Sequence, residues 1–313
     1  LIFVLFSDSY FFKTLKDRII ICLVILISPL MVPEIWLNTL NSMSYFGILT
    51  ILIFFQSNTN SNFLEKLSPY ILFLSGLSSL YSSILAPFFL IKYYLDRNKS
   101  NFHNFIFITL SAITQFIIII YTKFNGLIFD YRSGISLDKI INYCYNVIAK
   151  SLLGREINHY ILKYINDINH LILLSVILIS LFIFFLYFFL KHKDRILNYL
   201  VSFFIVESFL ILIGSWNDEV QGRYAAVPGV LLIIIFYRLH QLNRGFLKFF
   251  FFLMVLNTLV IGAYEFKIKT IYPSFLSCID CPIWKDEVYK WRLDQTYKMK
   301  IWNYPGKSMM LSN

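Results

Sequence analysis

The chain has 313 residues, of which 58% are hydrophobic and only 15% are charged, and its formal net charge is +10. With 33 Phe and 21 Tyr, it has too little polar material to cover a soluble core of this length, which excludes an ordinary water-soluble enzyme. The basic excess does not indicate a nucleic-acid partner, because that class requires a soluble basic face. The sequence therefore predicts an all-α polytopic membrane protein.

The chain opens inside an apolar run, at Leu1 rather than Met, without the basic flank and cleavage site of a signal peptide. We expect a fragment whose N-terminal part is missing, with residues 1–12 forming the end of an earlier span. A bilayer core of about 30 Å needs about 20 helical residues, and 19–35 is a shorter candidate. The clearest spans are 104–121, 171–190, 196–213, 225–240 and 246–263.

The stretches 43–56 and 67–95 are harder to interpret. The second is interrupted by small residues and a proline, namely Ser75, Gly76, Ser78, Ser79, Ser82, Ser83 and Pro87. It is either one broken helix or two short ones, so the two stretches together cross once or three times. The whole chain is expected to hold about 8 to 10 transmembrane or membrane-embedded helices.

Basic residues gather on one side of the membrane if this broken region makes three crossings. They are Lys13, Lys16, Arg18, Lys66, Lys92, Arg97, Lys99, Lys191, Lys193, Arg195, Arg238, Arg244 and Lys248. Because Lys and Arg accumulate in short cytoplasmic loops, this side is predicted to be the cytoplasm. The short opposite loops, 34–42 and 214–224, contain only Arg223 among basic residues.

Two longer segments are expected on the outer side, 122–168 and 264–313. In the first, apolar residues recur at helical spacing between a capping Ser136 and a terminating Gly154. They are Leu137, Ile140, Ile141, Cys144, Val147, Ile148 and Leu152. This amphipathic helix is expected to lie flat on the outer leaflet, where it packs on the membrane domain or guides a lipid substrate. Residues 1–263 then form the transmembrane domain and 264–313 a small extracytoplasmic cap.

Polar residues at the outer side are the candidates for function. Glu207 lies well inside a span, where an ionisable residue is costly and suggests function; the alternative is a protonated Glu that hydrogen-bonds a neighbouring helix. Arg223 could hold a lipid phosphate through two parallel hydrogen bonds, or it could be an interfacial anchor or a partner for a carboxylate. Tyr224 belongs to the same site, or to the aromatic belt of the membrane interface.

Several segments together resemble bacterial GT-C glycosyltransferases and their relatives. "GRYAAVPGVLL" at 222–232 is similar to the step before a late helix in these proteins, and "PEIWLNTLNSMSYFGIL" at 33–49 to an outer loop with paired asparagines, here Asn38 and Asn41. "LSGLSSLYSSILAPFFLIKYY" at 74–94 looks like their Gly/Ser-broken span. "CPIWKDEVYKWRLDQTYKMKIWNYPG" at 281–306 resembles a Trp-rich terminal segment.

The resemblance implies transfer of a sugar from a polyprenyl-phosphate donor to a glycan or lipid acceptor at the outer face of the bacterial cytoplasmic membrane. In that class the catalytic carboxylate usually lies in the first outer loop, a region that we expect to precede Leu1, so the catalytic base is unknown. Glu34, Asp218 and Glu219 are outer-face carboxylates that could assist or bind a divalent metal, and Asn217 is a further polar residue there. No metal ligand set is assigned.

Two other functions compete with sugar transfer. A transporter or flippase for a lipid-linked saccharide would also need an intramembrane charge and broken helices. A non-catalytic membrane scaffold would bind a partner through its outer cap. The transporter requires a path that joins both faces of the membrane near Glu207. The enzyme requires a cavity that is open outward and to lipid, and the scaffold requires neither feature.

Overall fold

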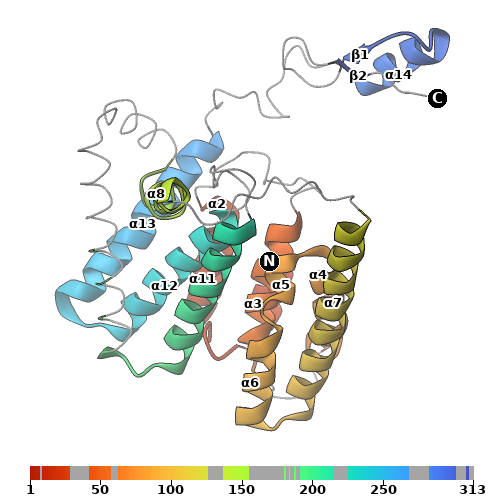
Figure 1. The fold of residues 1–313 in the computed structure, drawn as a ribbon. Coiled ribbons are helices and arrows are strands. Elements are labelled where there is room, and N and C mark those ends of the chain that lie inside the picture. Colours follow the sequence, from red (N-terminus) through yellow and green to blue (C-terminus); the bar gives the residue numbers. More distant parts are fainter. Residues whose placement is uncertain are drawn as a thin grey trace. The chain divides into compact units, whose positions relative to one another are not determined.

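The computed structural model describes residues 1–7, 9–28, 42–57, 63–125, 137–154, 180, 183, 187, 191–214, 225–267, 282–300 and 308–309. The chain forms two compact units, Leu1–Glu265 and Phe266–Asn313, which are described separately. The larger unit is all-helical in its described parts (Figure 1). The protein is an all-α polytopic membrane protein, as its composition predicts.

In the larger unit the helix bounds are α1 Ile2–Phe6, α2 Leu15–Ile27, α3 Ser42–Phe54, α4 Phe63–Ser78, α5 Leu80–Ser83, α6 Ala86–Asp96, α7 Lys99–Phe124, α8 Leu137–Tyr143, the π-helix η3 Cys144–Ala149, α11 Arg195–Gly214, α12 Ala226–Leu242 and α13 Gly245–Lys267. Several of these helices, among them α4, α6, α7 and α11, run along a common direction, whereas α8 is seen end-on in the same view (Figure 1). The helical stretch that follows η3 is described as far as Gly154, which has the left-handed backbone (φ 76°) expected of a terminating glycine.

Three of the described helices, α7, α11 and α13, are long and apolar enough to cross a membrane. They confirm the spans predicted at 104–121, 196–213 and 246–263. The α7 helix exposes a continuous apolar face that includes Ile113, Phe116 and Ile120, as expected for a helix in contact with lipid. The predicted span at 225–240 is the shorter α12, and 171–190 lies almost wholly outside the described residues.

The broken region makes three passes rather than one. The helix α4 stops at Ser78, and the extended backbone of Ser79 (φ −146°, ψ 121°) lets the chain reverse into α5 and α6. The hydroxyl of Ser83 donates to the carbonyl oxygen of Gly76 at 2.8 Å and holds the two arms of this reversal together. At the far ends of the arms, Ser68 of α4 bonds Gln56 and Lys92 of α6 bonds the carbonyl oxygen of the same Gln56.

Close packing of α4 on α7 depends on Gly76. A Cβ atom at this position would lie 1.8 Å from Oγ and 2.7 Å from Cβ of Ser111 on α7, so the helices would have to separate. We expect Gly76→Ala to lower the free energy of unfolding by about 1–3 kcal/mol, the usual cost of overpacking. Unfolding in mixed micelles would measure the loss. Gly214→Ala, which meets nothing within 4 Å, is the control, and Ser111→Gly should rescue Gly76→Ala.

The N-terminal segment differs from the expected span end. Only Ile2–Phe6 is helical, and the chain then runs extended beside the end of α3, where Ser9 forms a bridge with Gln56. The helix α2 begins with a capping box in which Thr14 Oγ accepts from Asp17 N at 3.2 Å, while Asp17 accepts from Thr14 N at 3.1 Å. This box fixes the direction in which α2 leaves the segment.

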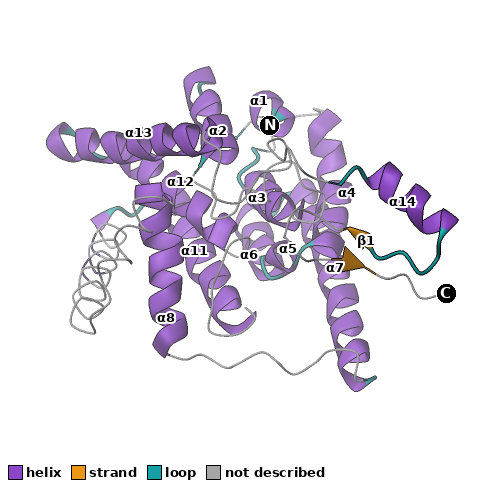
Figure 2. Cartoon of the chain, turned by 90° about the horizontal axis from the view of Figure 1, so that it is seen from above, coloured by secondary structure: helices purple, strands orange, loops and turns teal. Residues whose placement is uncertain are grey.

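The core of the larger unit surrounds α12, whose residues from Ala226 to Tyr237 are all buried. Among the described elements, α11, α2, α3 and η3 contact α12, and the view from above shows α11 beside it (Figure 2). A second part of the core is aromatic, with Phe54 at the end of α3 in edge contact with Phe89, Tyr199 and Phe203. Such pairs add specific geometry to apolar burial.

The amphipathic helix predicted at 137–152 packs on the bundle. Tyr143, Val147, Ile148 and Leu152 belong to the buried core, and the η3 segment contacts α12. The structure thus supports packing on the membrane domain, one of the two roles considered for this helix. The π-helical step was not predicted, because apolar spacing does not separate i+4 from i+5 hydrogen bonding.

The smaller unit contains α14, Trp284–Leu293, and a two-residue antiparallel ladder between β1, Met299–Lys300, and β2, Ser308–Met309. Glu287 of α14 joins these elements, since its carboxylate accepts from Lys300 N at 2.7 Å, Lys290 Nζ at 2.9 Å and Tyr297 Oη at 2.9 Å. These hydrogen bonds, led by the one from Lys300 N, lower the pKa of Glu287 to about 2. The unit is thus held by a carboxylate as much as by its apolar residues.

Candidate functional site

The basic residues predicted to share one side of the membrane do lie at one end of the bundle, here called the basic end. Hydrogen bonds tie the start of α2 to the end of α12, and the loop before α11 to both α12 and α6. At the same end of the bundle, α3 ends beside the start of α4, and the end of α12 contacts the start of α13. The three passes of 43–95 bring the basic residues of that region to the same end of the bundle as the other basic residues.

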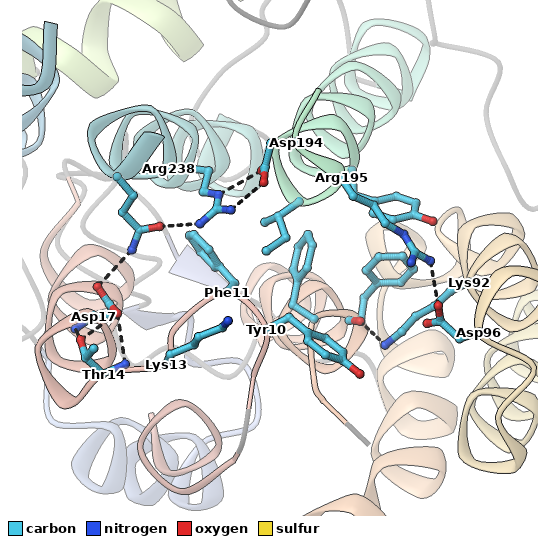
Figure 3. A pocket seen from close by; sticks show the side chains of 15 residues that line it. Tyr10, Phe11, Lys13, Thr14, Asp17, Lys92, Asp96, Asp194, Arg195 and Arg238 are labelled. Atoms are coloured by element: carbon cyan, nitrogen blue, oxygen red, sulfur yellow. Dashed lines mark hydrogen bonds and ion pairs between the residues drawn. The ribbon is translucent and has the colours of Figure 1, made fainter. Parts of the chain in front are cut away.

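A cavity of about 620 Å³ opens at the basic end, where α2, α3, α6, α11 and α12 converge (Figure 3). Its volume falls in the range of sites that bind small molecules. The lining residues are Tyr10, Phe11, Lys13, Thr14, Asp17, Phe54, Phe55, Lys92, Asp96, Asp194, Arg195, Ile196, Tyr199, Arg238 and Gln241. Four cations and three carboxylates thus share a wall with aromatic rings.

Each carboxylate of the cavity is engaged inside the protein. Asp17 accepts from Thr14 as described, from Gln241 Nε2 at 3.0 Å and from the hydroxyl of Tyr237. Asp96 accepts from Arg195 Nη2 at 3.0 Å. The side chain of Asp17 therefore serves both as the cap of α2 and as a link between α2 and α12.

Asp194 is bound by an arginine and by a backbone N–H group. Arg238 binds it with two parallel hydrogen bonds, Nε at 3.0 Å and Nη2 at 2.7 Å, and Leu197 N donates at 2.8 Å, so that Asp194 also caps α11. Burial alone would raise the pKa of Asp194, but the bonds from Arg238 and Leu197 lower it below the ordinary value of 3.8. Asp194 is therefore ionised at neutral pH.

The two lysines of the cavity have no carboxylate partner among the described residues. The ammonium group of Lys92 is buried and donates to the backbone carbonyl oxygens of Phe54 at 2.5 Å and Gln56 at 3.2 Å. Lys13 makes no hydrogen bond or ion pair within the described part of the chain, and its side chain extends toward the middle of the cavity (Figure 3). The cavity therefore holds more positive charge than its own carboxylates neutralise.

A second unusual group is Glu207, in the half of α11 away from the basic end. Its side chain is fully buried, and neither carboxyl oxygen has a hydrogen-bond partner among the described residues. Ser208, the next residue, bonds the hydroxyl of Tyr143 and the carbonyl oxygen of Phe204 at 2.5 Å. Within the described part of the chain, Glu207 is thus a buried carboxyl group without a hydrogen-bond partner.

Most of the predicted site residues lie outside the described residues. They are Glu34, Asn38, Asn41, Asn217, Asp218, Glu219, Arg223 and Tyr224. The structure nevertheless fixes the ends of the helices that flank the last five of them, Gly214 of α11 and Ala226 of α12. Both ends lie away from the basic end. Within the described ranges, no three His, Cys, Asp or Glu side chains gather to hold a metal ion.

The cavity at the basic end was not predicted. Its basic residues were used only to predict which loops face the cytoplasm. A further signal was present in the sequence, because each of the three carboxylates directly precedes an arginine, at 17–18, 96–97 and 194–195. Carboxylates in loops that are otherwise basic suggest charge pairing between loops rather than solvation alone. The sequence could not show that these three dipeptides meet, because they are far apart along the chain.

Comparison with known proteins adds no relative. No protein-family model, curated protein or solved structure matches the chain.

Proposed function

We propose that the protein is a bacterial cytoplasmic-membrane glycosyltransferase of the GT-C class, which moves a sugar from a polyprenyl-phosphate donor to an acceptor at the outer face. The observation that carries the proposal is the position of the connection between α11 and α12. Its flanking residues, Gly214 and Ala226, lie at the end of the bundle opposite the basic end. If the basic end is cytoplasmic, this connection faces outward, where a lipid-linked donor is used.

The residue types of this connection suit the reaction. Arg223 can hold a phosphate through two hydrogen bonds, and such a cation stabilises the departing lipid phosphate. Asp218 and Glu219 are carboxylates in the same short segment, suited to accept a proton from the acceptor or to hold a divalent metal. The quoted resemblance at 222–232 supports the same assignment.

The proposal has a direct topological test. A single cysteine at Asn217 should react with a membrane-impermeant maleimide added outside intact cells, whereas a cysteine at His192, at the basic end, should react only after permeabilisation. The reverse pattern would place the connection in the cytosol and end the proposal.

Arg223 is the residue to test for lipid-phosphate binding. We expect Arg223→Ala to weaken binding of undecaprenyl phosphate about 10- to 100-fold, since a hydrogen bond to a charged group contributes about 1.5–3 kcal/mol. Arg223→Lys should retain more of the affinity because the charge remains. Arg244→Ala, an exposed arginine at the basic end, is the matched control. Unchanged binding by Arg223→Ala would remove its assigned role.

A flippase for a lipid-linked saccharide is the second candidate. Glu207 favours it, because this buried carboxyl group lies within α11, between the cavity at the basic end and the outward connection. Such a protein would move a fluorescent lipid-linked saccharide across proteoliposomes without changing it. An enzyme would transfer the sugar and leave the lipid on its original leaflet, so one preparation with both readouts separates the two functions.

A further inference from the structure

We infer that the cavity at the basic end is a binding site for a phosphate monoester, with Lys13 and Lys92 as its cationic ligands. This site lies at the opposite end of the bundle from the proposed donor site and does not depend on it. The inference rests on the charge balance of the cavity, on the unused donors of the two lysines and on the apolar part of the lining.

The charge balance leaves the cavity positive. Its four cations face three carboxylates, and those carboxylates are occupied by Arg195, by Arg238 and by neutral donors. Neither lysine lies within ion-pair distance of a carboxylate in the described part of the chain. The buried ammonium group of Lys92 interacts with Asp96 and Glu65 only at longer range, and an anionic ligand in direct contact would relieve the cost of burying this charge.

Lys92 is built into the wall of the cavity as a fixed donor. Its side chain is only 5% exposed, and it lies with Nζ 5.2 Å from the centre of the Phe54 ring. An ammonium group has three N–H donors, and two of them are used by the carbonyl oxygens at the end of α3. The third remains available for a ligand oxygen.

Lys13 supplies the second charge from the other side. It precedes the capping box of α2, so its backbone position is set by the hydrogen bonds between Thr14 and Asp17. Its side chain is exposed and points into the cavity from the wall opposite Lys92 (Figure 3). A phosphate monoester, which carries a charge of about −1.5 to −2 at neutral pH, matches two ammonium groups.

The remaining lining indicates an organic ester rather than the bare ion. Phe11, Phe55 and Tyr199 border the same space, and two of these rings already stack with arginine side chains, Phe11 with Arg238 and Tyr199 with Arg195. A volume of about 620 Å³ leaves room beside the phosphate for a glycerol, a sugar or the upper part of a lipid. The paired arginines then shape the wall, and the lysines bind.

The test uses the full-length protein in neutral detergent with two probes that share this chemistry. Glycerol 3-phosphate represents a soluble ester and dioleoyl phosphatidic acid a lipid headgroup, and phosphatidylcholine is the lipid control. We expect at least one probe to bind, measured by titration calorimetry and by a rise in the unfolding temperature. Binding of the soluble probe alone, or of the lipid alone, identifies the source of the ligand.

The variants make the assignment specific. Lys13→Met and Lys92→Met should each weaken binding of the responding probe at least tenfold, whereas Lys16→Met, an exposed lysine of the same helix start outside the cavity, should bind like the wild type. Arg223→Ala should also bind like the wild type, which separates this site from the proposed donor site. Failure of both probes to bind, unchanged binding by Lys13→Met, or equal loss with Lys16→Met would overturn the inference.

Discussion

Replacing Arg238 by methionine is expected to lower the free energy of unfolding by about 2–3 kcal/mol. The change leaves the carboxylate of Asp194 partly buried without the cation that pairs with it, and removing one partner of a fully buried pair costs about 3–5 kcal/mol. The side chains of Arg238 and Asp194 are 15% and 20% exposed, so solvent screens part of this cost. Methionine keeps an unbranched apolar stem but lacks the guanidinium group, whose central carbon lies 6.0 Å from the centre of the Phe11 ring.

Unfolding of the ligand-free protein in mixed micelles measures the effect, and a second ion pair of the same cavity provides the control. Arg195 pairs with Asp96 but is 54% exposed, so Arg195→Met should cost at most about 1 kcal/mol. Adding Asp194→Asn to Arg238→Met should recover part of the loss, since it removes the unpaired charge. Equal costs for Arg238→Met and Arg195→Met would contradict the role of burial.

The same pair predicts a pH dependence with a definite sign. The pKa of Asp194 is lower in the folded protein than its ordinary value of 3.8. Its contribution to stability is therefore fully present above about pH 4 and is lost as the pH falls through the folded pKa. The difference between the wild type and Arg238→Met should shrink over that acidic range, and a constant difference would assign the cost to lost packing.

Replacing Glu207 by methionine is expected to stabilise the protein and to abolish flipping, the function that Glu207 favours. The two carboxyl oxygens have no partner among the described residues, and a buried unsatisfied polar group costs about 1–3 kcal/mol. An apolar side chain of similar length should recover that free energy. Flipping would lose its ionisable group and should not remain, a trade of activity for stability that functional sites often show.

Two further variants make this prediction specific. Ser208→Ala, one residue away, should destabilise, because it leaves the buried hydroxyl of Tyr143 without its partner. Glu207→Gln keeps the shape but not the charge, and its activity in proteoliposomes reports whether ionisation is required. A loss of stability with Glu207→Met would mean that the carboxyl group holds the fold together, and full activity would leave it only a packing role.

The sequence predicted the helices that face lipid better than it predicted those that do not. Apolar runs of full length identify α7, α11 and α13, because a lipid-exposed helix must match the bilayer and has few other constraints. In the broken region, the sequence showed serine and glycine residues without showing where the chain turns. Tertiary contacts determine where the chain turns, since Gly76 can approach Ser111 only if α4 lies against α7.

The candidate site could be predicted only in part for the same reason. Lys13, Arg195 and Arg238 were correctly predicted to lie at the same end of the bundle, because loop charge is a local signal. Their arrangement around a cavity is not local, as Asp17 meets Gln241 across more than half of the chain. The buried position of Glu207 was predicted from its place in a span, whereas its lack of a partner depends on where Tyr143 lies.

The complete enclosure of α12 has a consequence for the response of this protein to its bilayer. A helix that touches no lipid feels no mismatch between its own length and the hydrocarbon thickness. The helices with the most exposed apolar surface, α7 and α13, bear that mismatch and can tilt to relieve it. The cavity at the basic end takes no side chain from either of them. Its geometry is therefore insulated from changes in lipid chain length that would reorient the outer helices.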